Sequence, residues 1–350
     1  MARCVLFAEV PGFYAAVARA DDPALAGRPV LVGGDPRKRG RVQAATSEAL
    51  AAGIELEMPM LEALRLCPSA RVVRTDMARF RDASRRLLAV LRGVLPSLEP
   101  FGLGGAFAAV EDAAPESLAE RCVAEVAEAL SLPLRVGVAK GKFLARLAAG
   151  GLAAESGVLR VPEGDEAAFL APLPATRLDG VGRKTAAALA EMGATTIADV
   201  AALGRERLQE AFGPHGLRIH ACAAGADAEP VRAARHPKSL SRESTLEAET
   251  RDAAVLRELL AGLAQQLEEE LRGSALAARR VAIRVRFPDR GTTSRSATLP
   301  RATQSAAELC GVAERLLERT HAGARPVRGL GIQLSLLAAA GEADRQLELF

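Results

Sequence analysis

Hydrophobic and polar positions change their spacing several times along the chain, and each spacing predicts an element. Short apolar runs at residues 3–10 and 28–33 are typical of buried strands, and the second run ends in two glycines. Residues 76–94 carry apolar side chains at helical spacing, which predicts a long amphipathic helix. We also predict helices at 13–19, 43–53, 60–67, 115–130 and 142–149, and strands at 103–110 and 134–139.

The last third of the chain has a different order of elements. After a first strand it predicts a helix at 253–272, strands at 279–287 and 292–299, a helix at 304–320 and a strand at 329–337. This β-α-β-β-α-β order is typical of a ferredoxin-like α+β domain with both helices on one face of a small sheet. Strand 279–287 has one apolar face and one face that carries arginine. The apolar positions are Val281, Ile283, Val285 and Phe287, and they alternate with Arg280, Ala282, Arg284 and Arg286.

Length and composition favour a globular protein of several domains. The 350 residues allow about two to four domains of roughly 100–200 residues each. Hydrophobic residues make up 49% and charged residues 25%, which excludes a disordered chain. A net charge of +3 does not by itself indicate nucleic acid. Without a charged leader or an apolar run of about 18 residues, we expect a cytoplasmic protein. The five cysteines lie far apart, which argues against a zinc site or a disulfide framework.

Residues 178–200 form the clearest local motif, two short helices around a glycine turn. Gly180 and Gly182 allow a tight turn whose N–H groups face outward at a helix N-terminus, a geometry that binds phosphate oxygens. Lys184 and Thr185 follow the turn. We therefore predict a helix-hairpin-helix that contacts a DNA backbone, with an ordinary helical hairpin as the alternative.

The arginine-bearing strand lies in a strongly basic segment. Residues 272–301 contain eight arginines and one acidic residue, Asp289. A surface of one charge sign fits a phosphate backbone, where each contact releases counterions. We therefore predict DNA contacts at Arg284 and Arg286, against the alternative of a solvated sheet face in an arginine-rich protein.

The chain ends in a polar segment followed by three apolar side chains. Gln346 precedes Leu347, Leu349 and Phe350, and exposed apolar residues at the end of a polar segment indicate a binding function. Folding back onto the neighbouring domain is the alternative.

Taken in order, these motifs resemble the Y-family (DinB/UmuC-type) translesion DNA polymerases over essentially the whole chain. The matching stretches are VPGFYAAVA, RPVLVGG, LCP, LEPFGLGGAF, GVAKGKFLARLA, LDGVGRKTAAAL, KSLSREST and GLGIQLSLL. The resemblance implies a palm at 1–162 with fingers inserted at about 20–75 and a helix-hairpin-helix thumb at 163–228. A linker at 229–237, a little finger at 238–338 and a tail at 339–350 with a sliding-clamp motif complete the architecture. It adds Lys238 and Ser239, in KSLSREST, to the predicted DNA contacts, and assigns Gln346, Leu347, Leu349 and Phe350 to the clamp.

The family's polymerisation chemistry requires carboxylates that hold two divalent metal ions. Where the family has D-x-D-x-F-[FY], this sequence keeps one carboxylate, Glu9, and where the family has an adjacent D-E pair it has Gly104 and Gly105. We therefore expect no metal cofactor, with Mg²⁺ relevant only if residual polymerase activity exists. Phe13, Tyr14, at the steric-gate position, and Lys142 match the family's nucleotide pocket and predict a vestigial pocket without catalytic residues.

The residues that this sequence lacks are those that the family uses for polymerisation, whereas the DNA-binding and clamp-binding features are present. This selection resembles the ImuB-type branch and implies an adaptor, not an enzyme, in damage-induced mutagenesis. The expected partners are primer-template DNA, the sliding clamp, an error-prone replicative-type polymerase and a RecA-like protein, with no membrane. Two alternatives are a weak polymerase that uses Glu9 and a regulator that occupies clamp and primer-template.

Overall fold

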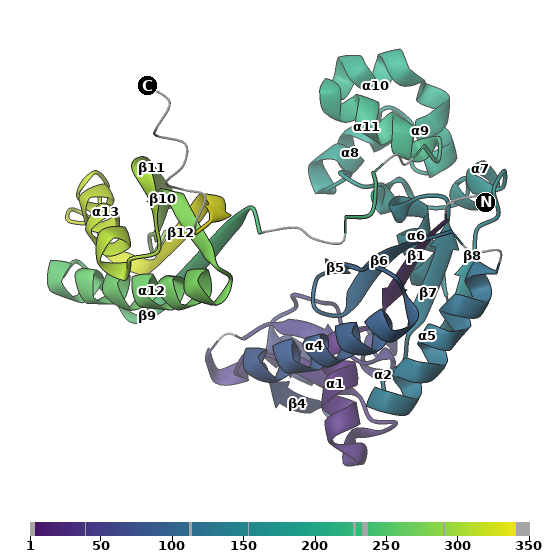
Figure 1. The fold of residues 1–350 in the computed structure, drawn as a ribbon, viewed down its shortest axis with the longest axis horizontal. Helices are drawn as coiled ribbons and strands as arrows, with labels where there is room; N and C mark the ends of the chain where they lie inside the picture. Colours follow the sequence, from purple (N-terminus) through teal and green to yellow (C-terminus); the bar gives the residue numbers. More distant parts are fainter. Residues whose placement is uncertain are drawn as a thin grey trace. The chain divides into compact units, whose positions relative to one another are not determined.

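The computed structural model (Figure 1) describes residues 4–38, 40–111, 114–152, 154–226, 229–232, 237–289 and 291–340. The chain forms two compact units, Met1–Ala234 and Arg235–Phe350, and the division falls within the predicted linker. The first unit contains the predicted palm, fingers and thumb, and the second contains the predicted little finger. The mixed α+β architecture predicted from the sequence is confirmed.

A five-stranded sheet with the order β5-β6-β1-β7-β8 forms the centre of the palm. Strand β1 lies in its middle and pairs antiparallel with both β6 and β7. Because strand residues alternate between faces, Leu6 and Ala8 of β1 face one core, and Val5 and Phe7 face another. The strands are β1 (Cys4–Glu9), β5 (Glu99–Phe101), β6 (Gly105–Val110), β7 (Arg135–Ala139) and β8 (Gly157–Arg160).

Helices cover the two faces of the palm sheet unequally. The Leu6 face packs against α4 (Met77–Val94) and α5 (Pro115–Leu130), whose buried residues belong to the same core. The opposite face packs against α6 (Lys142–Gly151). The next residue of that face after Phe7 is Glu9, so the retained carboxylate lies on the α6 side of the sheet.

The fingers form a small sheet of their own with the order β3-β2-β4. Residues 43–45, predicted as helix, belong to strand β3 because Ala44 and Ala45 pair with β2, and this pairing overrides the helix preference of alanine. The elements between β1 and α4 are α1 (Phe13–Asp21), η1 (Pro23–Leu25), β2 (Val30–Gly33), η2 (Pro36–Lys38), β3 (Val42–Ala45), α2 (Ser47–Ala51), α3 (Met60–Leu66) and β4 (Arg71–Arg74).

The thumb is a group of short helices whose core is continuous with the α6 face of the palm. Leu189, Ile197 and Ile219 of the thumb belong to the same buried cluster as Phe7 and Phe143 of the palm. The thumb elements are α7 (Glu166–Leu170), η3 (Ala175–Arg177), α8 (Arg183–Glu191), α9 (Ile197–Leu203), α10 (Arg205–Phe212) and α11 (Pro214–Ala223).

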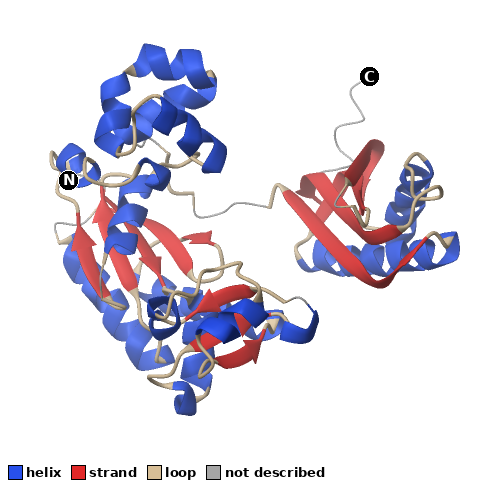
Figure 2. Cartoon of the chain, turned by 180° about the vertical axis from the view of Figure 1, so that it is seen from behind, coloured by secondary structure: helices blue, strands red, loops and turns tan. Residues whose placement is uncertain are grey.

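The little finger follows the order predicted from the sequence. Its sheet has the strand order β11-β10-β12-β9, with every neighbouring pair antiparallel, and both helices lie on one face (Figure 2). Strand β12 is thus inserted between β9 and β10, which makes a split β-α-β unit. The elements are β9 (Ser239–Thr250), α12 (Ala253–Gly273), β10 (Leu276–Arg286), β11 (Thr292–Thr303), α13 (Ala306–Glu318) and β12 (Val327–Ala339).

In the described part of the chain, no helix combines the length and the apolar character that crossing a membrane requires.

Candidate active site and nucleic-acid interface

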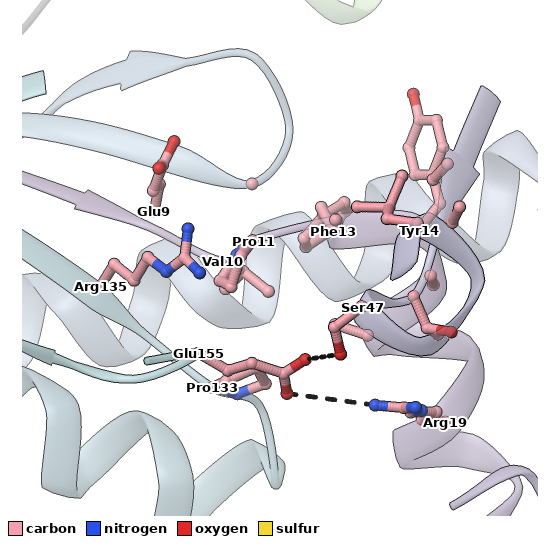
Figure 3. A pocket seen from close by; sticks show the side chains of 18 of the residues that line it. Glu9, Val10, Pro11, Phe13, Tyr14, Arg19, Ser47, Pro133, Arg135 and Glu155 are labelled. Atoms are coloured by element: carbon pink, nitrogen blue, oxygen red, sulfur yellow. Dashed lines mark hydrogen bonds and ion pairs between the residues drawn. The ribbon is translucent and has the colours of Figure 1, made fainter. Parts of the chain in front are cut away.

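A cavity of about 620 Å³ lies between the palm sheet and the fingers. Figure 3 shows Glu9 and Arg135 at its palm end, and Tyr14 with Ser47 on the side of α1 and the fingers. Phe13 and Tyr14 begin helix α1, so the chain runs directly from Glu9 on β1 into the cavity wall. The structure therefore brings together three residues that the sequence assigned to a degenerate active site: Glu9, Phe13 and Tyr14.

The strand register places the two glycines beside the retained carboxylate. Glu9 of β1 lies directly opposite Gly105 of β6, and the Val10 N–H donates to the Gly104 carbonyl at 2.8 Å. Directly opposed residues in an antiparallel pair have Cβ positions about 4.5–5.5 Å apart on the same face. Gly105 thus occupies the position from which a carboxylate would meet Glu9.

The space beside Gly104 is filled by the aromatic ring of Phe13. A Cβ built on Gly104 would lie 2.7 Å from the Phe13 Cβ and 2.9 Å from its Cγ, which is closer than carbon atoms approach. A Cβ on Gly105 would lie 3.0 Å from the Ala8 carbonyl oxygen and 3.3 Å from the Phe7 Cζ, a tight but smaller conflict. Restoring a side chain at Gly104 therefore requires Phe13 to move.

Charged neighbours of Glu9 are basic. Burial raises the pKa of the Glu9 carboxyl, and the positive charges of Arg135, Arg146 and Arg177 act against that rise. Within the ranges described, no group of three His, Cys, Asp or Glu side chains could hold a metal ion. One carboxylate among arginines does not fit a pair of Mg²⁺ ions, which require several oxygen ligands from protein and substrate.

The fingers side of the cavity is closed by a polar network that the sequence did not predict. The Ser47 hydroxyl donates to Glu155 Oε1 at 2.5 Å, and Arg19 lies 4.0 Å from the other oxygen of Glu155 (Figure 3). Arg19 also forms an ion pair with Glu48. These residues come from α1, α2 and the loop before β8, so only the fold could show that they meet.

Tyr14 is packed as an aromatic wall of the cavity. Its ring stacks on Phe80 of α4, with ring centroids 4.4 Å apart and an interplanar angle of 21°. The ring of Phe13 lies 6.0 Å from that of Tyr14. The aromatic outline of the predicted pocket is therefore present beside the altered carboxylate positions.

Lys142, the third residue predicted for the vestigial pocket, does not line this cavity. Its ammonium is buried and lies 2.5 Å from Glu99 Oε2, which also accepts the Arg232 N–H at 2.7 Å. Glu229 Oε1 lies 3.6 Å from the same ammonium. The Lys142 ammonium is thus paired with Glu99 on β5, an edge strand of the palm sheet, and with Glu229 after the thumb. These pairs link the palm to the segment that follows the thumb.

The glycine turn before α8 is tight, and the N–H groups of Val181 and Gly182 donate within it, to the carbonyls of Leu178 and Gly180. Gly180 has a φ of +86°, and a Cβ there would lie 2.4 Å from the His215 ring, which contacts the Gly180 carbonyl at 3.0 Å. Gly182 opens to solvent and precedes α8, whose first-turn N–H groups have no acceptor within the helix. Lys184 is exposed and Thr185 is half-buried on that turn.

One face of the little-finger sheet is open and carries the arginines of β10. Val281, Ile283 and Val285 are buried against the helices, so Arg280, Arg284 and Arg286 lie on the opposite face. Register places serine, threonine, glutamine, glycine and one glutamate around them. The neighbours on that face are Ser239, Ser241, Glu243, Thr245, Thr292, Ser294, Ser296, Thr298, Gly329, Gly331, Gln333 and Ser335.

The structure separates the two arginines that were predicted together. Arg286 is half-buried and its Nε lies 2.9 Å from Glu243 Oε1. Arg284 is exposed beside a shallow cavity of about 210 Å³ that Ser294 and Gln333 also line. Arg284 is therefore the cation with more freedom to meet a ligand.

The remaining predicted contacts lie at the ends of the second unit. Lys238 is exposed just before β9, and Ser239 is its exposed first residue. The predicted clamp-binding residues, Gln346, Leu347, Leu349 and Phe350, lie outside the described residues.

Comparison with known proteins agrees with this geometry over most of the chain. The impB/mucB/samB family matches residues 9–150, and the C-terminal domain of the same family matches residues 237–349. The chain is 36% identical over 354 residues to DNA polymerase IV of Alkalilimnicola ehrlichii, with 99% of each chain covered. This chain belongs to the Y-family of DNA polymerases.

Other Y-family members give the same picture of the family and fold. DNA polymerase IV of Methanoculleus marisnigri is 35% identical over 354 residues, covering 99% of this chain and 97% of that protein. Among solved structures, a Y-family polymerase chimera of Dbh and Dpo4 has a TM-score of 0.84 at 24% identity, covering 95% of this chain and 98% of that one. The insertion ternary complex of Dbh DNA polymerase has a TM-score of 0.72.

Proposed function

We propose that this Y-family chain is a DNA-binding adaptor for translesion synthesis that does not itself polymerise and is tethered to the sliding clamp. One observation carries the proposal: Glu9 is paired by strand register with Gly105, and Gly104 is hydrogen-bonded beside it. Phosphoryl transfer by two metals requires several carboxylates at this point. A single carboxylate among arginines supports a fold that has lost the reaction.

DNA binding is supported by surfaces outside the palm centre. Arg280, Arg284 and Arg286 lie on the open sheet face of the little finger, and in the thumb α8 begins directly after a glycine turn, which supports phosphate binding by its first-turn N–H groups. The solved Dbh structures that resemble this chain include ternary and binary complexes of a DNA polymerase. We expect primer-template DNA to be bound through its backbone and without sequence preference, because these groups match phosphates and not base edges.

The clamp and protein partners are inferred from the sequence of the tail. Gln346, Leu347, Leu349 and Phe350 present one amide and three apolar side chains, which suits an apolar pocket on the clamp. An adaptor that holds DNA and clamp together brings a separate error-prone polymerase, and a RecA-like protein, to a lesion.

A weak polymerase is the second candidate, because the cavity beside Glu9 remains open and is lined by Tyr14. A regulator that occupies clamp and primer-template has the same surface features as an adaptor. Binding to partner polymerases separates the regulator from the adaptor.

The tether is tested by removing residues 346–350 from the full chain. On primer-template DNA loaded with its clamp, we expect the truncated chain to lose clamp binding and keep its affinity for DNA without clamp. A matched control replaces Glu348 by Gln, which leaves the amide and apolar side chains in place. Loss of DNA affinity on truncation, or clamp binding without the tail, would contradict this assignment.

The adaptor role is tested by affinity capture of the full chain from its own host after DNA damage. We expect a replicative-type polymerase to be recovered with the full chain and with E348Q. A chain that binds clamp and DNA but recovers no polymerase acts as a regulator.

A further inference from the structure

Arg135 is a charged residue of the palm centre that the loss of carboxylates does not explain. It begins β7 and lies directly opposite Glu9 in the antiparallel pair of β1 and β7. Its side chain lines the same cavity as Glu9 (Figure 3). Glu9 is thus flanked on one side by Gly105 and on the other by an arginine.

The guanidinium of Arg135 is held in place by the backbone. Its Nε donates to the Ala154 carbonyl at 2.8 Å, which leaves the two terminal nitrogens directed elsewhere. The positive charge of Arg135 acts on the Glu9 carboxyl and opposes the rise of its pKa by burial. Arginine keeps its charge at every pH that a protein tolerates, so the position is permanently positive.

We propose that Arg135 closes the palm centre to divalent metal ions, so that the loss of carboxylates is not the only feature of this site that acts against metal binding. The inference rests on the proposed function and names a residue that enforces it. Restoring a carboxylate beside Glu9 is then insufficient to restore metal binding.

Charge and register together give the physical reason. A metal ion shared by carboxylates on β1 and β6 would lie on the α6 face of the sheet, where Arg135 projects from the adjoining strand. The Arg135 guanidinium and a metal ion on this face would repel each other strongly, because the site is partly buried and its effective dielectric constant is well below that of water. Arg135 therefore acts against any cation that Glu9 and a second carboxylate attract.

The test restores one carboxylate at the position where it fits. A side chain at Gly105 meets tight contacts with Ala8, Phe101 and Phe7, whereas a side chain at Gly104 displaces Phe13. The variants are the wild type, G105E, G105E/R135S and G105E/R92S, each as the full chain. Arg92 is a matched control, because it is an exposed arginine of α4 on the opposite side of the sheet.

The readout is direct binding of Mn²⁺, followed by electron paramagnetic resonance of the free ion, with thermal unfolding to verify that each variant folds. We expect G105E/R135S to bind Mn²⁺ at least about tenfold more tightly than G105E, because a neighbouring positive charge has been removed. G105E/R92S should match G105E.

Equal affinities for G105E and G105E/R135S would overturn the assignment of Arg135, as would tight Mn²⁺ binding by G105E alone. If G105E variants fail to fold, the same comparison is made between the wild type and R135S. There Glu9 alone supplies the carboxylate, and R135S should bind Mn²⁺ more tightly than the wild type if Arg135 repels metal. Polymerisation by the wild type is a separate result that would contradict the proposed function, whatever Arg135 does.

Discussion

The palm centre and the open face of the little finger are both built on β-sheets, yet they differ in how well they suit the ligands of a DNA polymerase, which are metal ions and DNA phosphates. At the palm centre, three adjoining strands present Glu9, Gly105 and Arg135 side by side, a set that cannot share a metal. On the open face, β10 presents Arg280 and Arg284 among small hydroxyl side chains.

The difference follows from how each kind of site works. Metal coordination requires several ligands to converge on one point, so replacing two of them ends it. Phosphate binding is a sum of separate contacts, each of which contributes alone. A polymerase fold can therefore lose its reaction through a few substitutions and retain the surfaces that bind DNA.

The largest expected effect concerns the stability of the palm and the contribution of its buried Lys142–Glu99 ion pair. Lys142→Met should lower the free energy of unfolding of the first unit by about 3–5 kcal/mol, because it removes the buried ammonium that pairs with Glu99. Chemical denaturation measures the change. The matched control is Lys140→Met, whose ion pair with Glu163 is exposed and should contribute less than about 1 kcal/mol.

Equal losses for the two lysine variants would show that the Lys142–Glu99 pair does not stabilise the palm. DNA binding by the folded fraction of Lys142→Met should be little changed, since Lys142 is buried and belongs to neither predicted DNA-binding surface. A selective loss of DNA affinity would place part of the interface in the palm and weaken the contrast between the two regions.

An intermediate effect is expected on the open face. Arg284→Ala should weaken DNA binding and reduce the slope of log affinity against log salt by about one unit, the value for one lost phosphate contact. Arg286→Ala should change the slope less, because its guanidinium is already paired with Glu243. Binding titrations at several salt concentrations measure both.

Arg272→Ala supplies the control for this pair, because Arg272 lies at the end of α12 and is paired with Glu268. Its slope should equal that of the wild type. If Arg284→Ala leaves the slope unchanged, the open face does not contact the DNA backbone.

The smallest expected effect concerns Glu9 itself. Burial raises the pKa of this carboxyl in the folded chain, so the folded state binds more protons than the unfolded state between the two pKa values. Stability therefore falls as the pH rises through that window, and the cost is fully present above it. Glu9→Gln should slightly stabilise the protein at neutral pH and have no effect in acid, below both pKa values.

Thermal unfolding of wild type and Glu9→Gln across the pH range measures this small difference. Destabilisation by Glu9→Gln at neutral pH would mean that the carboxylate is stabilised in the fold and that the surrounding arginines outweigh its burial. That outcome would mean that the palm centre favours an anion.

The sequence predicted the fold well where local pattern and tertiary structure agree. The alternation in residues 279–287 predicted a strand with Val281, Ile283 and Val285 buried, and this prediction is confirmed. The helices at 76–94 and 253–272 are present as α4 and α12. Each has a long apolar stripe at helical spacing, and only a helix places all of these side chains on one buried face.

Short elements were harder to predict, because their identity depends on distant partners. Strand β3 was predicted as helix, and β5 and β8 have too few residues for a period to appear. At the site, motif comparison identified Glu9, Gly104, Gly105, Phe13 and Tyr14. Arg135, Glu155 and the pairing of Lys142 with Glu99 could not be found, since each depends on strand register or loop placement.

The most direct test of the central claim is primer extension measured beside DNA binding on the same primer-template, with Mg²⁺ and with Mn²⁺. DNA polymerase IV of Alkalilimnicola ehrlichii serves as the positive control, being 36% identical over 354 residues. We predict that the wild-type chain binds this DNA and adds no nucleotide with either metal. Extension that disappears in Glu9→Ala would contradict it and show a working polymerase with one retained carboxylate.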